Sequence, residues 1–235
     1  MTGLTRTFFQ SRIVSAKNLQ KMEILAVVGS FLGIIASFAA GSFPTGLQYA
    51  TIVAPMGASA VLVFAVPASP LATPRAVILG NALSAAIGVL VSILVPTLPL
   101  ACALAVALAI GGMFVSRSLH PPGGASALTA VLAQPAAHGW VSAVAFPFLP
   151  VGLNAVFLVL AGVLFHRVTG HTYPHIARLP IVPDRTGHFR REDIQVALGQ
   201  LSDRLDVSLA DLEELFVLTE QAAERREKQG VSKNG

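Results

Sequence analysis

The stretch from His120 to Pro135, HPPGGASALTAVLAQP, places reactive and hydrogen-bonding groups inside a very apolar chain. His120 can exchange a proton near neutral pH. Ser126 offers a hydroxyl, and Gly124 leaves neighbouring backbone amides uncovered. Proline is well placed in the first turn of a helix, where its missing N–H costs nothing. The stretch therefore predicts a helix that begins at Pro122, with its start exposed to a hydrogen-bonding ligand.

A second copy of this pattern lies 67 residues earlier. Pro55–Leu62, PMGASAVL, and Pro122–Thr129, PGGASALT, share the frame Pro-x-Gly-Ala-Ser-Ala, and apolar runs flank both copies. An odd number of crossings per unit would invert the second copy relative to the first. Inverted repeats with interrupted segments indicate a transport site near the bilayer midplane. The alternative is that GASA only lets helices pack closely.

Two inverted helix starts would favour an anion. Each start is expected to leave backbone N–H groups free and to carry a partial positive charge. The partial charges at two helix starts do not by themselves offset the free-energy cost of burying an ion, so hydroxyls, retained water or a cation must contribute. Arg75 is a weaker candidate for that cation. The predicted substrate-binding residues are Gly57, Ser59, Gly124 and Ser126, with His120 and Arg117 on the approach.

The distribution of charge supports this chemistry. The chain is 54% hydrophobic and 12% charged, and no Asp or Glu lies between Ile24 and Pro183. A carboxylate-based proton relay or sodium site is therefore not expected. Cys102 is the single cysteine, so the pattern signals no disulfide, metal site or cofactor. The net charge of +4 suits an anionic membrane surface, and no aromatic-interleaved basic patch points to nucleic acid.

Apolar runs predict an all-α membrane protein with about six transmembrane or half-membrane elements. Residues 1–22 form a basic arm, 23–170 the transmembrane domain and 171–235 a cytoplasmic helical tail. A cleaved signal peptide is the alternative for the first run, and a re-entrant fifth element would change the crossing count. The predicted elements are Ile24–Gly41, Leu47–Val66, Ala76–Val95, Leu98–Val115, Val141–Phe165 and the short Pro122–Ala133.

Basic residues predict the orientation. With six elements, Arg75, Arg117, Arg167 and the tail fall on one side, together with the basic N-terminal arm. Positive loops favour the cytoplasm, so both termini are expected inside a bacterial-type inner membrane. Small residues predict close packing along two stripes, Gly80, Ser84 and Gly88 in one and Ala103, Ala107 and Gly111 in the other.

The sequence SRSLHPPGGASAL resembles the HPP family of integral membrane proteins, which is named for the motif at His120-Pro121-Pro122. PMGASAVLVFAVPASPLATPR, from Pro55 to Arg75, and HTYPH, from His171 to His175, are similar to further segments of that family in the same order. The resemblance covers about Ile24 to Pro174. It implies at least four membrane helices and a transporter. Plastid and cyanobacterial members are implicated in nitrite transport, whereas the residues alone indicate only a small anion.

The tail pattern predicts a helical hairpin. Ile194, Ala197, Leu198, Leu201 and Leu205 share one face of a helix over Glu192–Leu205. Ser208 and Asp211 then resemble a capping box before a second amphipathic helix. The hairpin is expected to bury its apolar stripe in a homo-oligomer or against the membrane domain, or else only on itself.

These observations predict a membrane transporter of a small monovalent anion, nitrite by the resemblance, and not an enzyme. Its expected partners are a small inorganic anion, the lipid bilayer and further copies of itself. A non-transporting membrane scaffold and an intramembrane Ser/His enzyme are the alternatives. For His120, the alternative to a role in the anion path is a polar interface residue bonded to the backbone. His166, His171 and His175 are spaced only loosely for a metal and are expected at the interface.

Overall fold

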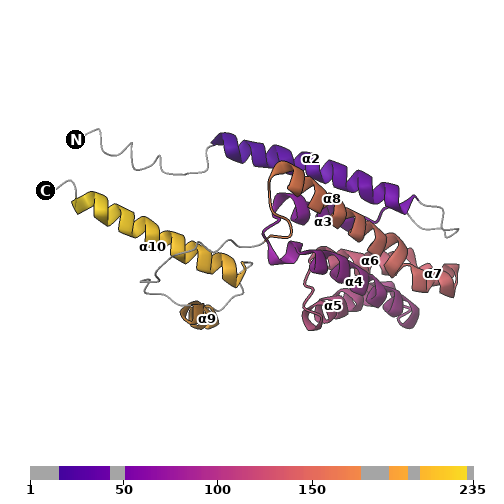
Figure 1. The fold of residues 1–235 in the computed structure, drawn as a ribbon. Coiled ribbons are helices and arrows are strands. Elements are labelled where there is room, and N and C mark those ends of the chain that lie inside the picture. The colour runs from indigo at the N-terminus through magenta and orange to yellow at the C-terminus, as the bar shows by residue number, and fades with distance from the viewer. Residues whose placement is uncertain (1–15, 43–50, 176–190, 201–206, 232–235) are drawn as a thin grey trace. The chain divides into compact units, whose positions relative to one another are not determined.

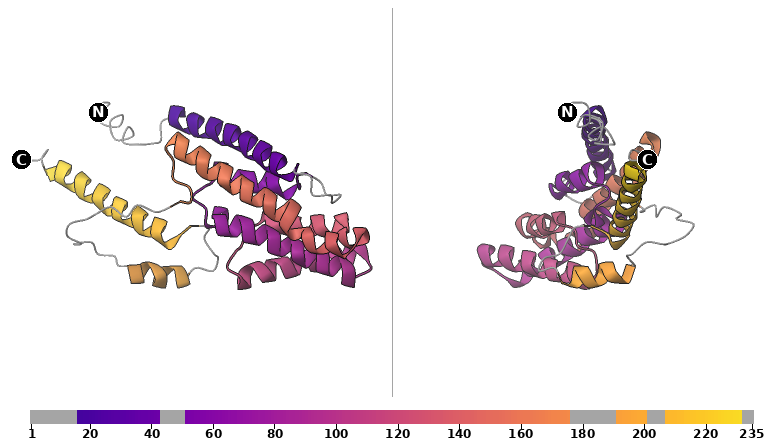
Figure 2. Two further views of the ribbon diagram at one scale, coloured as in Figure 1. Left: turned by 45° about the vertical axis from the view of Figure 1, so that its right-hand side comes forward. Right: turned by 90° about the vertical axis from the view of Figure 1, so that its left-hand side faces the viewer.

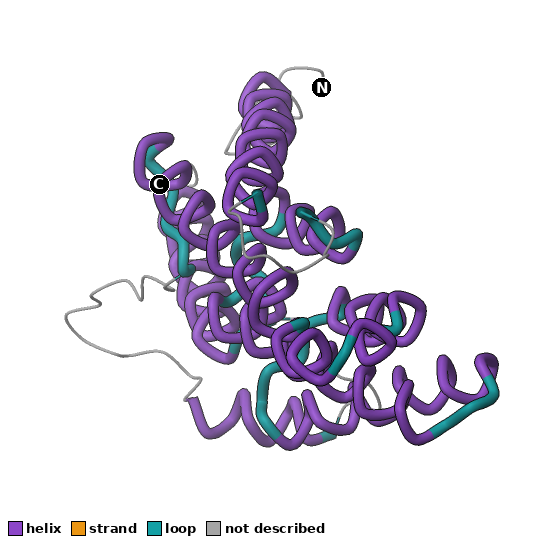
Figure 3. The backbone as a smooth tube through the Cα atoms, turned by 90° about the vertical axis from the view of Figure 1, so that its right-hand side faces the viewer, coloured by secondary structure: helices purple, strands orange, loops and turns teal. Residues whose placement is uncertain are grey.

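The computed structural model describes residues 16–42, 51–175, 191–200 and 207–231, and within these ranges the chain is helical without strands (Figures 1 and 3). It divides into two compact units, Met1–Pro174 and His175–Gly235. The first unit carries every element long or apolar enough to lie in a membrane among the described residues. The prediction of an all-α membrane protein is confirmed.

Four helical segments are long enough to cross a bilayer. Three are the single helices α2 (Ala16–Gly41), α4 (Pro74–Leu94) and α5 (Leu98–Val115). The fourth is the segment Trp140–Thr169. It consists of α7 (Trp140–Ala145), a π-helical turn η3 (Pro147–Gly152) and α8 (Leu153–Thr169). Two prolines in η3 cannot donate backbone hydrogen bonds, so the regular helix is interrupted there.

Two further helices are too short to cross. α3 (Pro55–Ala65) has 11 residues and α6 (Pro122–Ala133) has 12. They are about 17 and 18 Å long, against a hydrocarbon core of about 30 Å. The prediction of a 20-residue span over Leu47–Val66 is wrong, because Thr51–Ala54 form a non-helical turn and the helix begins at Pro55. Residues 43–50 lie outside the described ranges.

Short 3-10 turns follow each of these two helices. The turn η1 (Pro70–Ala72) joins α3 to α4, and η2 (Pro135–His138) joins α6 to α7. Ser69 and Thr73 cap η1 and α4, since their hydroxyl oxygens accept hydrogen bonds from Leu71 N and Ala76 N. Thr73 therefore sets where the long helix α4 begins.

The helices of the first unit pack in two matching sets (Figure 2). The helix α2 packs against α3 and α8, and α5 packs against α6 and α4. The two sets correspond to each other. In each set, the short helix with the Pro-x-Gly-Ala-Ser-Ala motif contacts one long helix, and that long helix contacts a second long helix. Each short helix thus lies beside the long helix that precedes it, and that long helix also contacts the long helix that follows the other copy.

The starts of the two short helices are held by contacts at different ends of the long helices. Asn154, at the start of α8, donates to the carbonyls of Ser37 near the end of α2 and of Thr51 just before α3. At the other end, Arg75 at the start of α4 donates to the carbonyl of Ser116 at the end of α5, shortly before α6. His166 near the end of α8 is bonded to the carbonyl of Val63 near the end of α3. The start of α3 therefore lies beside the end of α2, and the start of α6 follows the end of α5.

Asn154 fixes the start of α3. Besides the two bonds of its amide nitrogen, its Oδ1 accepts a hydrogen bond from Val53 N at 3.1 Å. Its own carbonyl accepts a hydrogen bond from the Ser37 hydroxyl. The Asn154 side chain is fully buried, so these bonds satisfy a polar group that would otherwise be costly. They also make α2 an integral part of the folded unit.

Close contact between α4 and α6 depends on small residues, as predicted for the first stripe. A Cβ on Gly88 would collide with the carbonyl oxygen of Ala127, and one on Gly123 would lie 2.8 Å from Ser84 Oγ. Gly80 approaches the turn before α6 in the same way, since a Cβ there would lie 2.7 Å from His120 Cβ. Only hydrogen at these positions permits this spacing.

The second predicted stripe, on α5, is wrong. Ala103 and Ala107 are exposed, and a Cβ on Gly111 would meet no atom within 4 Å. The buried face of α5 is instead formed by Ala101, Ala105 and Ala109, together with Met113. Both faces carry small residues at the same spacing, so only the tertiary packing distinguishes them.

The second unit contains α9 (Arg191–Gly199) and α10 (Leu209–Val231). Ser208 caps α10 as predicted, since its Oγ accepts a hydrogen bond from Asp211 N and donates to Asp211 Oδ2. The predicted helix over Glu192–Leu205 ends earlier, at Gly199, and residues 201–206 lie outside the described ranges. Ile194 on α9 is buried, whereas the apolar side chains of Leu215, Phe216 and Leu218 on α10 remain exposed.

Candidate functional site

The two repeat serines meet at a single asparagine. Asn81 on α4 donates from Nδ2 to Ser59 Oγ on α3 at 3.1 Å, and its Oδ1 accepts from Ser126 Oγ on α6 at 2.6 Å. His120 lies against the same group, with Nε2 2.8 Å from Ser59 Oγ. All four side chains have no solvent-exposed surface. We call these residues, Ser59, Asn81, His120 and Ser126, the serine–asparagine centre.

The hydrogen bonds of the serine–asparagine centre run in one direction. His120 Nδ1 lies 2.9 Å from the carbonyl oxygen of Leu71, which only accepts, so Nδ1 carries the proton. The unprotonated Nε2 then accepts from the Ser59 hydroxyl. Ser59 accepts from Asn81, which accepts from Ser126. The second amide hydrogen of Asn81 is donated to Val77 O. With the neutral Nδ1–H form of His120, every polar hydrogen of the four side chains in the centre therefore has an acceptor.

A left-handed turn places His120 in the centre. Arg117 adopts φ 51° after the end of α5, and Ser118 N donates back to Met113 O at 2.9 Å. This closing pattern reverses the chain directly after the helix. Ser118 is buried and Gly80 leaves room for the turn, so His120 enters the interior before α6 begins. The local sequence thus orients the imidazole toward α3.

Arg117 lies outside the centre. Its residue is exposed, and its side chain makes no hydrogen bond or ion pair with any part of the chain that the structure describes. Arg75 instead bonds the end of α5 through Ser116 O at 2.9 Å, where a cation complements the negative end of the helix dipole. Arg75 bonds Ser116, which directly precedes Arg117. Arg167 directly follows His166, which is bonded to Val63 O near the end of α3. These three cations therefore share one end of the unit.

The two aligned glycines also lie away from the serine–asparagine centre. Gly57 is exposed, and a Cβ there would meet no atom within 4 Å. At Gly124 a Cβ would meet only Val106, at an ordinary 3.9 Å. The neighbouring Gly123 is the glycine that packs tightly, against α4. Positions two residues apart point to different sides of a helix, so Gly57 and Ser59 cannot share one face.

The expectation of free backbone amides at both helix starts is wrong. Gly57 N donates to Ala54 O, and Gly124 N donates to Pro121 O. Met56 N and Gly123 N are bonded in the same way to residues three positions earlier. Ala54 and Pro121 are already helical in backbone conformation, so each first turn closes as a tight 3-10 turn. The hydrogen-bonding groups of the centre are therefore side chains.

Asn81 was not among the predicted ligands. An asparagine on an apolar helix is typical of interhelical hydrogen bonding in membranes, which gives no indication of its partners. Its position on the same helical face as Gly80 and Ser84 was the available signal. Asn154, which lies on α8 after the second copy, bonds backbone groups of Thr51, Val53 and Ser37 and the Ser37 hydroxyl, and among the described residues it does not bond the serine–asparagine centre.

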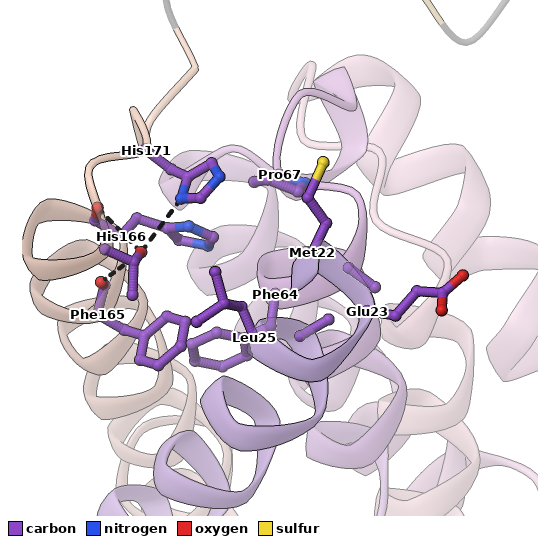
Figure 4. A pocket seen from close by; sticks show the side chains of 11 residues that line it. Met22, Glu23, Leu25, Phe64, Pro67, Phe165, His166 and His171 are labelled. Atoms are coloured by element: carbon purple, nitrogen blue, oxygen red, sulfur yellow. Dashed lines mark hydrogen bonds between the residues drawn. The ribbon is translucent and has the colours of Figure 1, made fainter. Parts of the chain in front are cut away.

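A pocket of roughly 430 Å³ lies elsewhere, between the described parts of α2, α3 and α8 (Figure 4). Its wall is mainly apolar and includes Met22, Leu25, Phe64 and Phe165. His166 and His171 lie close together on one side, with ring centroids 6.1 Å apart. No residue of the serine–asparagine centre lines this pocket.

The histidines of the C-terminal segment do not assemble a metal site. His166 bonds Val63 O at 2.8 Å, and His171 bonds the Thr169 hydroxyl. His175 pairs with Asp211 at 2.7 Å in the second unit. No group of three or more metal-ligating side chains occurs within the described ranges. One ring nitrogen of each of these three histidines is therefore occupied by a structural hydrogen bond or ion pair.

The fold and the centre define a multi-pass helical membrane protein with a buried, uncharged hydrogen-bonding site between two short helices. The family model described as "HPP, transmembrane region" matches residues 16–174. The chain belongs to the HPP family. This confirms the resemblance seen at His120-Pro121-Pro122.

Two curated relatives are transmembrane proteins of Dictyostelium discoideum. One is 38% identical over 114 residues, which is 47% of this chain and 36% of the relative. The other is 40% identical over 125 residues, which is 51% of this chain and 42% of the relative. The matched region thus spans less than half the length of either relative. No solved structure matches the chain.

Proposed function

We propose that this chain transports a small monovalent anion, with nitrite as the leading candidate, through the serine–asparagine centre. The observation that carries the proposal is the pairing of Ser59 and Ser126, one from each short helix, on Asn81. In this proposal the two copies form an inverted repeat, and the centre lies where they meet. A nitrite ion only accepts hydrogen bonds, and the centre offers hydroxyl and amide donors without a competing carboxylate.

Energetics require several donors at once. Burying an ion costs several kcal/mol even after the protein relaxes. A hydrogen bond to a charged group contributes about 1.5–3 kcal/mol. Three donors, from Ser59, Asn81 and Ser126, would therefore offset most of that cost.

In the structure described, the donors bond one another, so the centre is closed. An entering anion must replace the bonds that Ser59, Asn81 and Ser126 make among themselves. Such an exchange requires α6 to shift relative to α4 or α3, as expected of alternating access around a fixed site. We infer that the present arrangement is the unloaded, occluded state.

His120 provides a route for proton coupling. If Nε2 takes up a proton, it must donate to Ser59 Oγ, because Nδ1 already donates to Leu71 O. The Ser59 hydroxyl then loses its acceptor and becomes free to bind the anion. Protonation would also place a positive charge beside the site. Both effects favour the anion, so uptake should increase as the pH falls.

The membrane context of the proposal follows the shared end of the three arginines. We place that end, both termini and the tail in the cytoplasm of a bacterial-type inner membrane, in accordance with the excess of positive charge. We further propose a homo-oligomer that forms through membrane helices and the tail, since Leu215, Phe216 and Leu218 on α10 are exposed.

Ion flux into proteoliposomes tests the function. Nitrite, nitrate, formate, chloride and a cation should be compared, and nitrite uptake should exceed the others and rise as the external pH falls. Ser59→Ala and Ser126→Ala should each raise the half-saturating nitrite concentration roughly ten- to a hundred-fold. His120→Ala should remove the pH dependence with less effect on anion preference. Thr129→Ala is the matched control on α6, because that hydroxyl bonds only Ala125 O.

Absence of anion flux from the correctly inserted parent protein would refute transport and favour a membrane scaffold. Unchanged half-saturation in both serine variants would place the anion path elsewhere. The control variant separates a loss of ligand from a general defect in insertion.

The Ser59–His120 pair favours one second candidate, an intramembrane Ser/His hydrolase. Its 2.8 Å contact and the proton on Nδ1 match a nucleophile held by a general base. Leu71 O replaces the usual carboxylate, however, and the backbone N–H groups of α3 are committed to helix bonds. The described backbone of α3 therefore leaves no N–H donor for an oxyanion beside Ser59. A serine-reactive phosphonate probe tests this candidate, since covalent labelling that depends on Ser59 and His120 would support it.

A further inference from the structure

Ser84 carries an unpaired hydroxyl at the edge of the serine–asparagine centre. Its side chain is fully buried on α4, and its Oγ has no hydrogen-bond partner. The other buried side-chain atom without a partner in the described ranges is Nδ1 of His166, which acts as an acceptor because Nε2 donates to Val63 O. Ser84 therefore holds a buried donor that the closed structure leaves unused.

The unpaired hydroxyl faces α6. An ideal Cβ on Gly123 would lie 2.8 Å from Ser84 Oγ, so the hydroxyl points at the backbone of α6 where a side chain is missing. Ser84 follows Asn81 by three positions on α4, and Ser126 follows Gly123 by three on α6. Residues at this spacing are neighbours on one helical face. Ser84 thus lies one helical turn from the Asn81–Ser126 hydrogen bond, in the same helix contact.

Two other serines near the ends of long helices donate their hydroxyl hydrogens to the preceding turn. Ser92, also on α4, donates to Val89 O at 2.8 Å, and Ser116, directly after α5, donates to Gly112 O at 2.8 Å. A serine in a helix commonly forms such a bond to the preceding turn. Ser84 forms none, which is destabilising in a dry interior. Local rules are broken in this way mainly at functional sites.

We propose that Ser84 donates its hydroxyl hydrogen directly to the transported anion when α6 moves away from α4. The inference rests on the proposed transport function and adds a ligand to it. The loaded site would then contain Ser84 together with Ser59, Asn81 and Ser126 as donors to a small oxyanion. Ser84 differs from the others because it loses no protein partner when the anion binds.

Two measurements on one variant separate this role from a structural one. Ser84→Ala should raise the half-saturating nitrite concentration about ten-fold or more, because a hydrogen bond to a charged ligand is lost. The same variant should unfold at an unchanged or higher temperature in detergent, because an unsatisfied buried hydroxyl is removed. Ser84→Cys keeps nearly the same volume with a weaker donor, so its affinity should lie between those of Ser84→Ala and the parent. Ser92→Ala is the matched control on the same helix.

The outcomes distinguish the inference from the proposed function. If the parent carries no anion, both fail. If Ser59→Ala and Ser126→Ala weaken nitrite uptake while Ser84→Ala does not, transport stands and the assignment of Ser84 is wrong. A fall in both affinity and unfolding temperature in Ser84→Ala would also overturn it, because that result defines a packing residue.

Discussion

Replacing Gly80 by alanine should force His120 out of the serine–asparagine centre. The new Cβ would lie 2.7 Å from His120 Cβ and 2.7 Å from the backbone oxygen of Ser118. Ordinary contacts of this kind are 3.4–4 Å, so a gap of about 0.7 Å or more must open. Neither neighbour is the end of a flexible side chain. The turn that carries His120 must therefore move as a unit.

Overpacking of this kind costs about 1–3 kcal/mol of unfolding free energy. Gly111→Ala on α5 is the matched reference, because its Cβ would meet no atom within 4 Å. Both substitutions gain the same helix preference of alanine over glycine, roughly 0.5–1 kcal/mol. That gain cancels in the comparison. The difference between the two variants therefore isolates the overpacking cost.

Denaturant unfolding in detergent micelles measures this difference, and nitrite flux reports on the centre. Gly80→Ala should be less stable than Gly111→Ala by about 1–3 kcal/mol. It should also lose the pH dependence of uptake, since the Ser59–His120 bond is broken. Equal stability of the two alanine variants, with unchanged flux, would show that the turn does not depend on Gly80 for space.

Three further predictions concern orientation and the tail. Cysteines placed at Arg75 or Arg117, in a Cys102→Ala background, should react in intact cells only with membrane-permeant reagents; reaction with an impermeant reagent would contradict the cytoplasmic assignment. Deleting Gly187–Gly235 should weaken oligomers more than it alters anion selectivity, and an unchanged subunit number with altered selectivity would argue against this. Burial alone would raise the pKa of Asp211, but hydrogen bonds from Ser208 and His175 lower it below the usual value. This contact therefore stabilises the tail above about pH 4 and is lost as the pH falls through the folded pKa, so Asp211→Asn should reduce the acid sensitivity of tail proteolysis.

The sequence repeat singled out two serines that the fold brings together, because identical frames place identical groups at equal depth in each helix. Ser59 and Ser126 meet at Asn81, and His120, which was expected only on the approach, contacts Ser59 directly. The distribution of charge likewise predicted a membrane domain, since a bilayer excludes unpaired carboxylates. These features are local or compositional, so they can be read without knowing how the helices pack.

The identity of the bridging group required the fold. Asn81 could have faced any neighbour, and only the rotation of α4 directs it between the two serines. The same rotation explains why Gly123 packs tightly and Gly124 does not. The closed first turns could not be foreseen either, because they depend on Ala54 and Pro121 adopting helical backbone angles before each proline. Backbone amides that seemed available from the motif are consumed by this detail.

The unequal partners of Asn81 and Asn154 affect how natural variants of such chains should be interpreted. Asn81 links the side chains of the serine–asparagine centre, whereas Asn154 holds the backbone of Thr51 and Val53 in place. A change at Asn154 would reduce the amount of protein that reaches the membrane. A change at Asn81 would leave that amount closer to normal and impair each molecule that arrives. Tolerance measured at one copy is therefore no guide to tolerance at the other, despite their similar motifs, and a mutational scan should score abundance and transport separately.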